Sequence, residues 1–297
     1  VDAARDEIEK AVQAALACAG LTLSDIAGVG LGIAGADLPE DYTMLEKTTF
    51  TPLLGDIPRT LRNDSMGGLR GGTRKPYGIV IACGTGCVCA GVNIAGDETR
   101  VGGISEDFGD KISGTEIGIE GLMAVWRYRD GIIKETALVD LFLERSGCGD
   151  VDALFYKFYR NEMKYDDLQP MAQLVFEAAH DGDEVACDIL EESGTYLAKM
   201  VNSVARKLDM TRTTFDVVMA GSVFKGKSPV MMDSMRTRIH RECPDANLVM
   251  PVYEPVVGTL LLGMELDLKV DNGLYDILTQ GLAAAEAKYD AHFKTIE

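Results

Sequence analysis

Apolar residues recur at two spacings along the first part of the chain, and each spacing predicts a different element. In residues 1–19 the apolar positions fall three or four apart and end at Gly20, which predicts an amphipathic helix. Residues 26–34 form an apolar run interrupted by glycines, which predicts a buried strand, and Pro39 favours the start of a short helix. Residues 61–65 indicate the end of a strand that meets a helix. Such alternation is typical of a mostly parallel sheet covered by helices.

The pattern changes at residues 75–77, which we take as a domain boundary. Residues 78–83 and 87–93 are short apolar runs on either side of a Gly-Thr-Gly turn, which predicts a hairpin. A further glycine turn before Val101 extends it to an antiparallel meander of two or three strands. From residue 113 to about residue 210 the periodicity is helical.

Strands return in the last third of the chain. A long helix over residues 185–208 is followed by predicted strands over 215–220 and 247–252. A helix is predicted to start at Gly258, and a last amphipathic helix runs over about 273–295. Together the elements predict a mixed α/β architecture that is repeated once in outline.

Composition restricts the kinds of partner. The 297 residues carry a net charge of −18 and no basic stripe, which argues against nucleic acid, since its phosphates need clustered Lys and Arg. No stretch approaches the roughly 20 apolar residues of a membrane span, so we expect no membrane partner. Seven irregularly spaced cysteines favour reduced thiols and a cytoplasmic protein. Cys83, Cys87 and Cys89 cluster; core packing is the simpler interpretation, and a redox or iron–sulfur role is the alternative.

The turn Gly84-Thr85-Gly86 is the first candidate for chemistry. A Gly-Thr-Gly turn between two strands exposes backbone N–H groups where side chains are absent, as a phosphate cradle requires. A tight hairpin turn without a ligand is the alternative.

Asp64 is the second candidate. A carboxylate at a strand-to-helix turn is well placed to accept the proton of an attacking hydroxyl. The alternative is that Asp64 only caps a helix that begins near Ser65, itself a candidate N-cap.

Two glycines later in the chain form the third candidate. Gly221 and Ser222 follow a predicted strand, and small residues there would let a flat ring lie against the backbone. Gly258, at a predicted helix start, would do the same or bring a helix N-terminus to phosphate oxygens.

The order of these pieces resembles the N-acetylglucosamine kinase branch of the BadF/BadG/BcrA/BcrD-type ATPases, within the actin-like sugar kinases. The matching pieces run across about 230 residues of the chain. They are Gly32-Ile33-Ala34-Gly35-Ala36-Asp37, Asn63-Asp64-Ser65-Met66-Gly67-Gly68, Ile81-Ala82-Cys83-Gly84-Thr85-Gly86, Gly102-Gly103, Gly109-Asp110, Ala220-Gly221-Ser222-Val223 and Gly258.

The resemblance implies two ribonuclease-H-like lobes, the first incomplete at its N-terminus, that close over ATP, Mg and a small sugar. The lobes would span residues 1–76 and 77–272, with the final helix, residues 273–297, packed back on the first. Whether the protein is a homodimer is left open.

The resemblance also assigns roles to individual residues. Asp64 would be the catalytic base, and Asn63, Gly109 and Asp110 would lie at the sugar. Nucleotide contacts would come from Gly84, Thr85, Gly86, Gly221, Ser222 and Gly258.

Two departures qualify these expectations. The family's first phosphate loop, with its metal-holding Asp, has no counterpart here, so we expect that further sequence precedes Val1 and assign no metal ligand within the chain. The family's aromatic residue after the glycine pair is replaced by Ile104, and Lys111-Ile112 replaces Glu-Gly. These replacements leave the identity of the sugar open.

Two functions therefore compete. The first is transfer of the γ-phosphate of ATP to a hydroxyl of a sugar or amino sugar resembling N-acetylglucosamine. The second is an ATP-hydrolysing activator of a dehydratase or reductase, which needs exposed cysteines for an iron–sulfur cluster. A nucleotide-binding regulator without turnover is a third reading.

Overall fold

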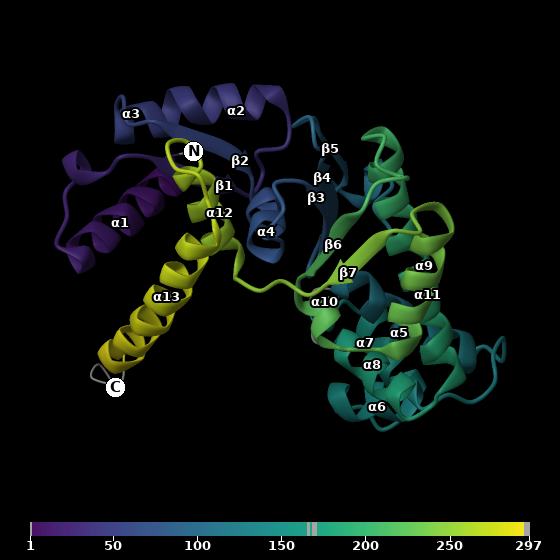
Figure 1. Cartoon of the computed structure of the whole chain (residues 1–297). Helices are drawn as coiled ribbons and strands as arrows, with labels where there is room; N and C mark the ends of the chain where they lie inside the picture. Colours follow the sequence, from purple (N-terminus) through teal and green to yellow (C-terminus); the bar gives the residue numbers. More distant parts are fainter. Residues whose placement is uncertain (1, 165–166, 168–170, 294–297) are drawn as a thin grey trace. The chain divides into compact units, whose positions relative to one another are not determined.

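The computed structural model describes residues 2–164, 167 and 171–293 (Figure 1). By their contacts the residues group into two compact units, Val1–Arg62 with Thr259–Glu297 and Asn63–Gly258. These bounds differ from the expected 1–76 and 77–272, and the assignment of each part to a lobe stays a prediction. The last four residues of the expected final helix, 294–297, lie outside the described residues.

The first unit contains a two-stranded sheet and helices. Its elements are α1 (Asp2–Ala19), η1 (Leu23–Asp25), β1 (Val29–Ile33), α2 (Pro39–Leu45), η2 (Glu46–Phe50), α3 (Thr51–Leu54) and α13 (Asn272–Phe293). Two elements, β2 (Arg59–Asn63) and α12 (Pro255–Met264), carry the chain across the division between the units. Strand β1 pairs with β2.

The prediction that residues 26–34 form a buried strand needs correction. The strand is shorter, and each residue of β1 is only partly buried. Close packing explains Gly30 of β1: a Cβ there would lie 1.9 Å from the carbonyl oxygen of Thr259, and a Cβ on Gly263 of α12 would lie 2.4 Å from the Gly30 nitrogen. The backbones of β1 and α12 thus meet directly, and the strand belongs to a sheet of two strands among the described residues.

The second unit is built on a five-stranded sheet. Its strands are β3 (Gly78–Cys83), β4 (Cys87–Val92), β5 (Glu98–Gly102), β6 (Phe215–Ala220) and β7 (Ala246–Val249), in the spatial order β5-β4-β3-β6-β7. The meander β3-β4-β5 is antiparallel, as predicted, whereas β6 and β7 run parallel to β3. The mixed α/β fold class is confirmed.

Helices cover both faces of this sheet. The helices of this unit are α4 (Asp64–Gly72), α5 (Gly114–Arg129), α6 (Leu138–Ser146), α7 (Val151–Tyr159), α8 (Ala172–His180), α9 (Glu184–Lys207), α10 (Ser222–Lys225) and α11 (Pro229–Glu242), with the short η3 (Glu106–Phe108). Figure 1 shows α4 on one side of the strands and α9 and α11 on the other.

Side-chain alternation in the strands explains this arrangement. Ile79 and Ile81 of β3 are fully buried and belong to the large core beneath α9. Val80, between them, is also fully buried but points to the opposite face, where a Cβ on Gly68 of α4 would lie 3.6 Å from it. Each fully buried side chain of this size stabilises the fold by about 1.5–3 kcal/mol. A strand that is apolar at every position is what a sheet covered on both faces requires.

Candidate functional site

The turn between β3 and β4 is the centre of the candidate nucleotide site. Cys83 faces Cys87 across the hairpin, and the N–H of Gly84 donates to the carbonyl of Gly86 at 2.8 Å. Thr85 and Gly86 are exposed, and a Cβ on Gly86 would meet no atom of the described residues within 4 Å. The turn therefore presents its backbone to open space, as a phosphate cradle requires.

The first turn of α5 lies directly against this hairpin turn. Its N-cap is Ser113, whose side chain accepts from a backbone N–H of the first turn at 3.1 Å. The N–H of Gly114 donates to the carbonyl of Gly84 at 2.6 Å, and Thr115 Oγ1 donates to the carbonyl of Thr85 at 3.5 Å. The helix thus brings the positive end of its dipole to the turn, where it favours an anion.

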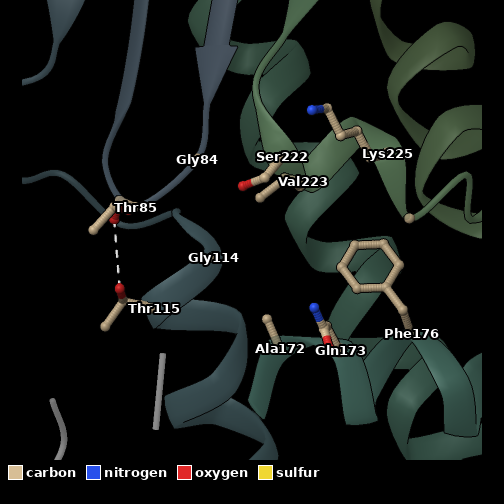
Figure 2. Close-up of a pocket in the computed structure, with 11 residues that line it drawn as sticks. Gly84, Thr85, Gly114, Thr115, Ala172, Gln173, Phe176, Ser222, Val223 and Lys225 are labelled. Carbon is tan, nitrogen blue, oxygen red and sulfur yellow. Dashed lines mark hydrogen bonds between the residues drawn. The ribbon is translucent and has the colours of Figure 1, made fainter. Parts of the chain in front are cut away.

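The end of β6 passes the end of β3 at very short range. Gly221 has a φ of 102°, and a Cβ there would lie 2.2 Å from the carbonyl oxygen of Cys83. Glycine is therefore required at this position. It places Ser222 beside the turn, with Oγ 3.6 Å from where a Cβ on Gly84 would be, and Figure 2 shows the hydroxyl directed toward the turn.

These three pieces border one cavity of about 370 Å³. Figure 2 shows the hairpin turn on one side, with Gln173 and Phe176 of α8 below. Its polar and aromatic lining includes Thr85, Thr115, Gln173, Phe176, Ser222 and Lys225. A concave site of this size with a few convergent polar groups is typical of small-molecule binding.

The structure brings some of the expected nucleotide residues together and leaves others apart. Gly84, Thr85 and Ser222 line the same cavity, whereas Gly86 lines a neighbouring one of about 440 Å³. Phe176 and Lys225 also line the first cavity and were not expected from the sequence. Neither has a local motif, because both reach the cavity from helices whose place is set by tertiary packing.

Gly258 has a different environment from the one expected. The helix begins at Pro255, so Gly258 lies within α12 and not at its start. A Cβ there would lie 1.9 Å from the carbonyl oxygen of Gly67 and 2.4 Å from the Gly71 nitrogen, both in α4. Close helix packing accounts for this glycine, and its contact with a nucleotide stays a prediction.

At the strand-to-helix turn that carries Asp64, the observed N-cap differs from the expected one. The N-cap of α4 is Asn63, not Ser65: Asn63 Oδ1 accepts from the N–H and the Oγ of Ser65 at 3.1 and 2.6 Å. Asn63 suits the position because its side chain reaches the free N–H groups of the first turn. Asp64 is therefore not the cap. It is exposed, and no hydrogen bond or ion pair joins its carboxylate to another described residue.

The neighbouring cavity is lined by Asp110, one of the three residues expected at the sugar, whereas Asn63 and Gly109 are not among its lining residues. It is bordered by the turn residues Thr85 and Gly86 and by the loop that joins β5 to α5, which includes Ile104 and Asp110. Asp110 Oδ2 accepts from the N–H of Ile104 at 2.8 Å. Carboxylate and hydroxyl groups thus border the cavity beside this turn, and their contact with a sugar stays a prediction.

The clustered thiols belong to the core of the hairpin. Cys83 and Cys89 are 0% exposed and Cys87 is 6% exposed. The pKa of the Cys87 thiol is raised by its hydrogen bond with Cys83 and by burial, and burial likewise raises the pKa of Cys89. Buried, protonated thiols are poor ligands for a cluster at a surface, so their position favours the core interpretation.

The described residues contain neither a metal-holding cluster nor a helix that could span a membrane. Within residues 2–164, 167 and 171–293, no group of three His, Cys, Asp or Glu side chains is arranged to hold a metal ion. Over the same part of the chain, no helix combines the length and apolar character that crossing a bilayer requires.

Comparison with known proteins identifies relatives over most of the chain. A family model described as the BadF/BadG/BcrA/BcrD ATPase family matches residues 1–263. N-acetyl-D-glucosamine kinase of Dictyostelium discoideum is 30% identical over 243 residues, which are 80% of this chain and 76% of the relative. N-acetylmuramic acid/N-acetylglucosamine kinase of Clostridium acetobutylicum is 26% identical over 256 residues, or 86% and 83%.

The fold also matches solved structures. A Chromobacterium violaceum protein provisionally named N-acetylglucosamine kinase superposes with a TM-score of 0.61 at 24% identity, over 84% of this chain and 81% of that one. The expected actin-like ATPase fold is thereby confirmed.

Proposed function

Because the chain belongs to the BadF/BadG/BcrA/BcrD ATPase family, we propose that it is an ATP-dependent kinase that phosphorylates a hydroxyl of a sugar or amino sugar. N-acetylglucosamine is the first acceptor to test, since the Dictyostelium relative carries that name. The replacement of the family's aromatic residue by Ile104, 49% exposed, keeps other amino sugars within the proposal. We place the activity in the cytoplasm, where free thiols stay reduced.

One observation carries the proposal most strongly. The Gly84–Thr85 turn, the start of α5 and Ser222 border a single cavity, although they come from three separate segments. Backbone N–H groups, a helix N-terminus and hydroxyls are the groups that hold nucleotide phosphates. The aromatic ring of Phe176, on the same cavity, offers a surface for the flat base, and Lys225 adds a positive charge.

The neighbouring cavity fits the acceptor. Asp110 would accept a hydrogen bond from a sugar hydroxyl, and Asp64 would take the proton of the hydroxyl that attacks the γ-phosphate. Asp64 is suited to this role because it is exposed and is not used as a helix cap. Mg²⁺ would neutralise charge on the phosphates when it is bound with ATP.

A panel of hexoses and amino sugars with coupled detection of ADP tests the proposal on the full-length protein. We expect ADP release with at least one amino sugar. No release above background with any sugar would refute the proposal.

Substitution tests Asp64 separately. Asp64→Asn should lower kcat by orders of magnitude and leave ATP binding unchanged, because only proton transfer is lost. Asp245→Asn removes the same charge from another exposed position of the second unit and should leave kcat unchanged. A retained kcat in Asp64→Asn would exclude Asp64 as the base.

A further inference from the structure

The loop between β5 and α5 is folded around the carboxylate of Asp110. It leaves β5 through Gly102 and Gly103, with φ of 69° and 78°. A Cβ on Gly102 would lie 2.9 Å from Asp110 Oδ1, and a Cβ on Gly103 would lie 2.8 Å from Val88 Cβ. Only glycines allow the loop to turn this tightly against both residues.

This geometry fixes one oxygen of Asp110 within the loop. Oδ2 accepts from the N–H of Ile104 at 2.8 Å, and Oδ1 lies on the side of Gly102. Because Asp110 also borders the cavity beside Thr85, the carboxylate combines a fixed position with access to a ligand.

A residue that is distant in sequence also contacts this loop. Tyr196 of α9 donates its hydroxyl hydrogen to the carbonyl of Gly109 at 2.8 Å. Gly109 has a φ of 95°, and its carbonyl belongs to the peptide group that leads into Asp110. The hydrogen bond from Tyr196 therefore holds the peptide group that is attached directly to the Asp110 Cα.

Helix α9 is a firm support for this bond. The residues that follow Tyr196, Leu197 and Ala198, are 0% exposed and lie in the large core. The pKa of Tyr196 is raised, first by burial and then by the negative charge of Asp110. The phenol thus stays protonated and remains a donor at neutral pH.

We propose that Tyr196 is a positioning residue that, through the carbonyl of Gly109, holds Asp110 in place for the acceptor and so sets the affinity for the acceptor but not for ATP. The inference rests on the proposed kinase function. Its distinguishing feature is selectivity: Tyr196 contacts the loop of the acceptor cavity, and it does not line the cavity that contains Ser222.

Tyr196→Phe tests the inference, because it removes one hydroxyl and leaves the ring in place. Loss of a single neutral hydrogen bond should raise the KM for the acceptor about three- to tenfold. The KM for ATP should change less than twofold, and kcat should change less than the acceptor KM. The probe is N-acetyl-D-glucosamine, or the best acceptor of the panel, and isothermal titration calorimetry measures its affinity without turnover.

Thr195→Val is the matched control. Thr195 is the preceding residue of α9, and its hydroxyl is hydrogen-bonded to Ser234 Oγ at 3.1 Å, away from the loop. This variant loses a hydrogen bond of the same helix and should keep the wild-type KM for the acceptor. Thermal unfolding of both variants shows whether a change of KM reflects general loosening of α9.

The possible results distinguish a failure of this inference from a failure of the proposed kinase function. Wild-type turnover with an unchanged acceptor KM in Tyr196→Phe overturns the inference alone. Equal rises in both KM values, or an equal rise in Thr195→Val, also overturn it, because either would indicate a structural role. A wild-type protein that neither releases ADP nor binds any sugar overturns the proposed function, and the inference with it.

Discussion

Replacement of Gly221 by Ala should lower the free energy of unfolding of the second unit by several kcal/mol, because the added methyl group overlaps backbone atoms of Cys83. Gly221 combines a φ of 102° with a ψ of 169°, a conformation that is adopted essentially only by glycine. The new Cβ would also lie 2.2 Å from the carbonyl oxygen and 2.6 Å from the carbonyl carbon of Cys83. Both partners are backbone atoms at the ends of paired strands, so neither can turn aside as a side chain would.

The backbone conformation and the steric overlap each contribute to the loss of unfolding free energy. A non-glycine residue in this backbone region costs about 1–3 kcal/mol. The overlap with the strand backbone costs about a further 1–3 kcal/mol if neighbouring groups shift as they do in overpacked cores. The sum, about 2–6 kcal/mol, is a large part of the 5–15 kcal/mol that stabilises a typical domain.

Gly182 supplies the matched control for the assay. It has a φ of 90°, but a Cβ there would meet no atom of the described residues within 4 Å. Gly182→Ala therefore carries the cost of a positive φ without the overlap. Urea unfolding followed by the fluorescence of Trp126, the single tryptophan, gives the free energy of unfolding for each variant from its midpoint and slope.

The difference in unfolding free energy between the two variants tests whether the close approach of β6 to β3 requires glycine at position 221. We expect Gly221→Ala to lose at least 1 kcal/mol more than Gly182→Ala. Equal losses would show that the end of β6 yields to the methyl group, and the close approach of β6 to β3 would then not be the reason for glycine at position 221.

Two further predictions concern the packing and charge of the second unit. Gly258→Ala should lower the free energy of unfolding by about 1–3 kcal/mol through overlap with Gly67. Gly149→Ala, in the same unit, should leave it nearly unchanged, because a Cβ there would meet no atom of the described residues within 4 Å, and urea titration compares the two variants. Burial alone would raise the pKa of Asp216, but hydrogen bonds from Lys75, Thr73 and Asn247 outweigh it and hold this pKa below its ordinary value of 3.8. A lowered pKa in the folded state adds stability above the unfolded value that is lost as pH falls through the folded value. Asp216→Asn should thus be about 1–3 kcal/mol less stable than wild type near pH 7, with the difference narrowing below about pH 4; a difference that does not vary with pH between 2 and 7 would contradict this origin.

Sequence patterns predicted two strands of the second unit at their observed bounds, because an apolar run between glycine turns is typical of a buried strand. Gly78–Cys83 and Phe215–Ala220 coincide with the expected strands. The strand expected over 247–252 instead runs over Ala246–Val249. Helix ends were less predictable. Asn63 and Ser65 are both good caps, and only the backbone geometry shows that Asn63 is the one used.

The candidate site was predictable only where local sequence defines it. The Gly84–Gly86 turn and Ser222 follow from their strands, whereas Phe176 reaches the cavity from a helix that no motif ties to it. Tyr196 was missed for the same reason, since its partner Gly109 lies 87 positions away. Gly258 illustrates the converse, because a glycine needed for helix packing has the same sequence appearance as one needed for a ligand.

The bond from the Gly114 N–H to the Gly84 carbonyl has a consequence for cooperativity. Asp110 lies four positions before Gly114, so a short, well-anchored segment joins the proposed acceptor contact to the proposed phosphate turn. If an occupied acceptor cavity changes the affinity for ATP by some factor, thermodynamic reciprocity requires ATP to change the affinity for the acceptor by the same factor. Titrating each ligand in the presence and absence of the other would measure one coupling free energy twice, and the two values must agree.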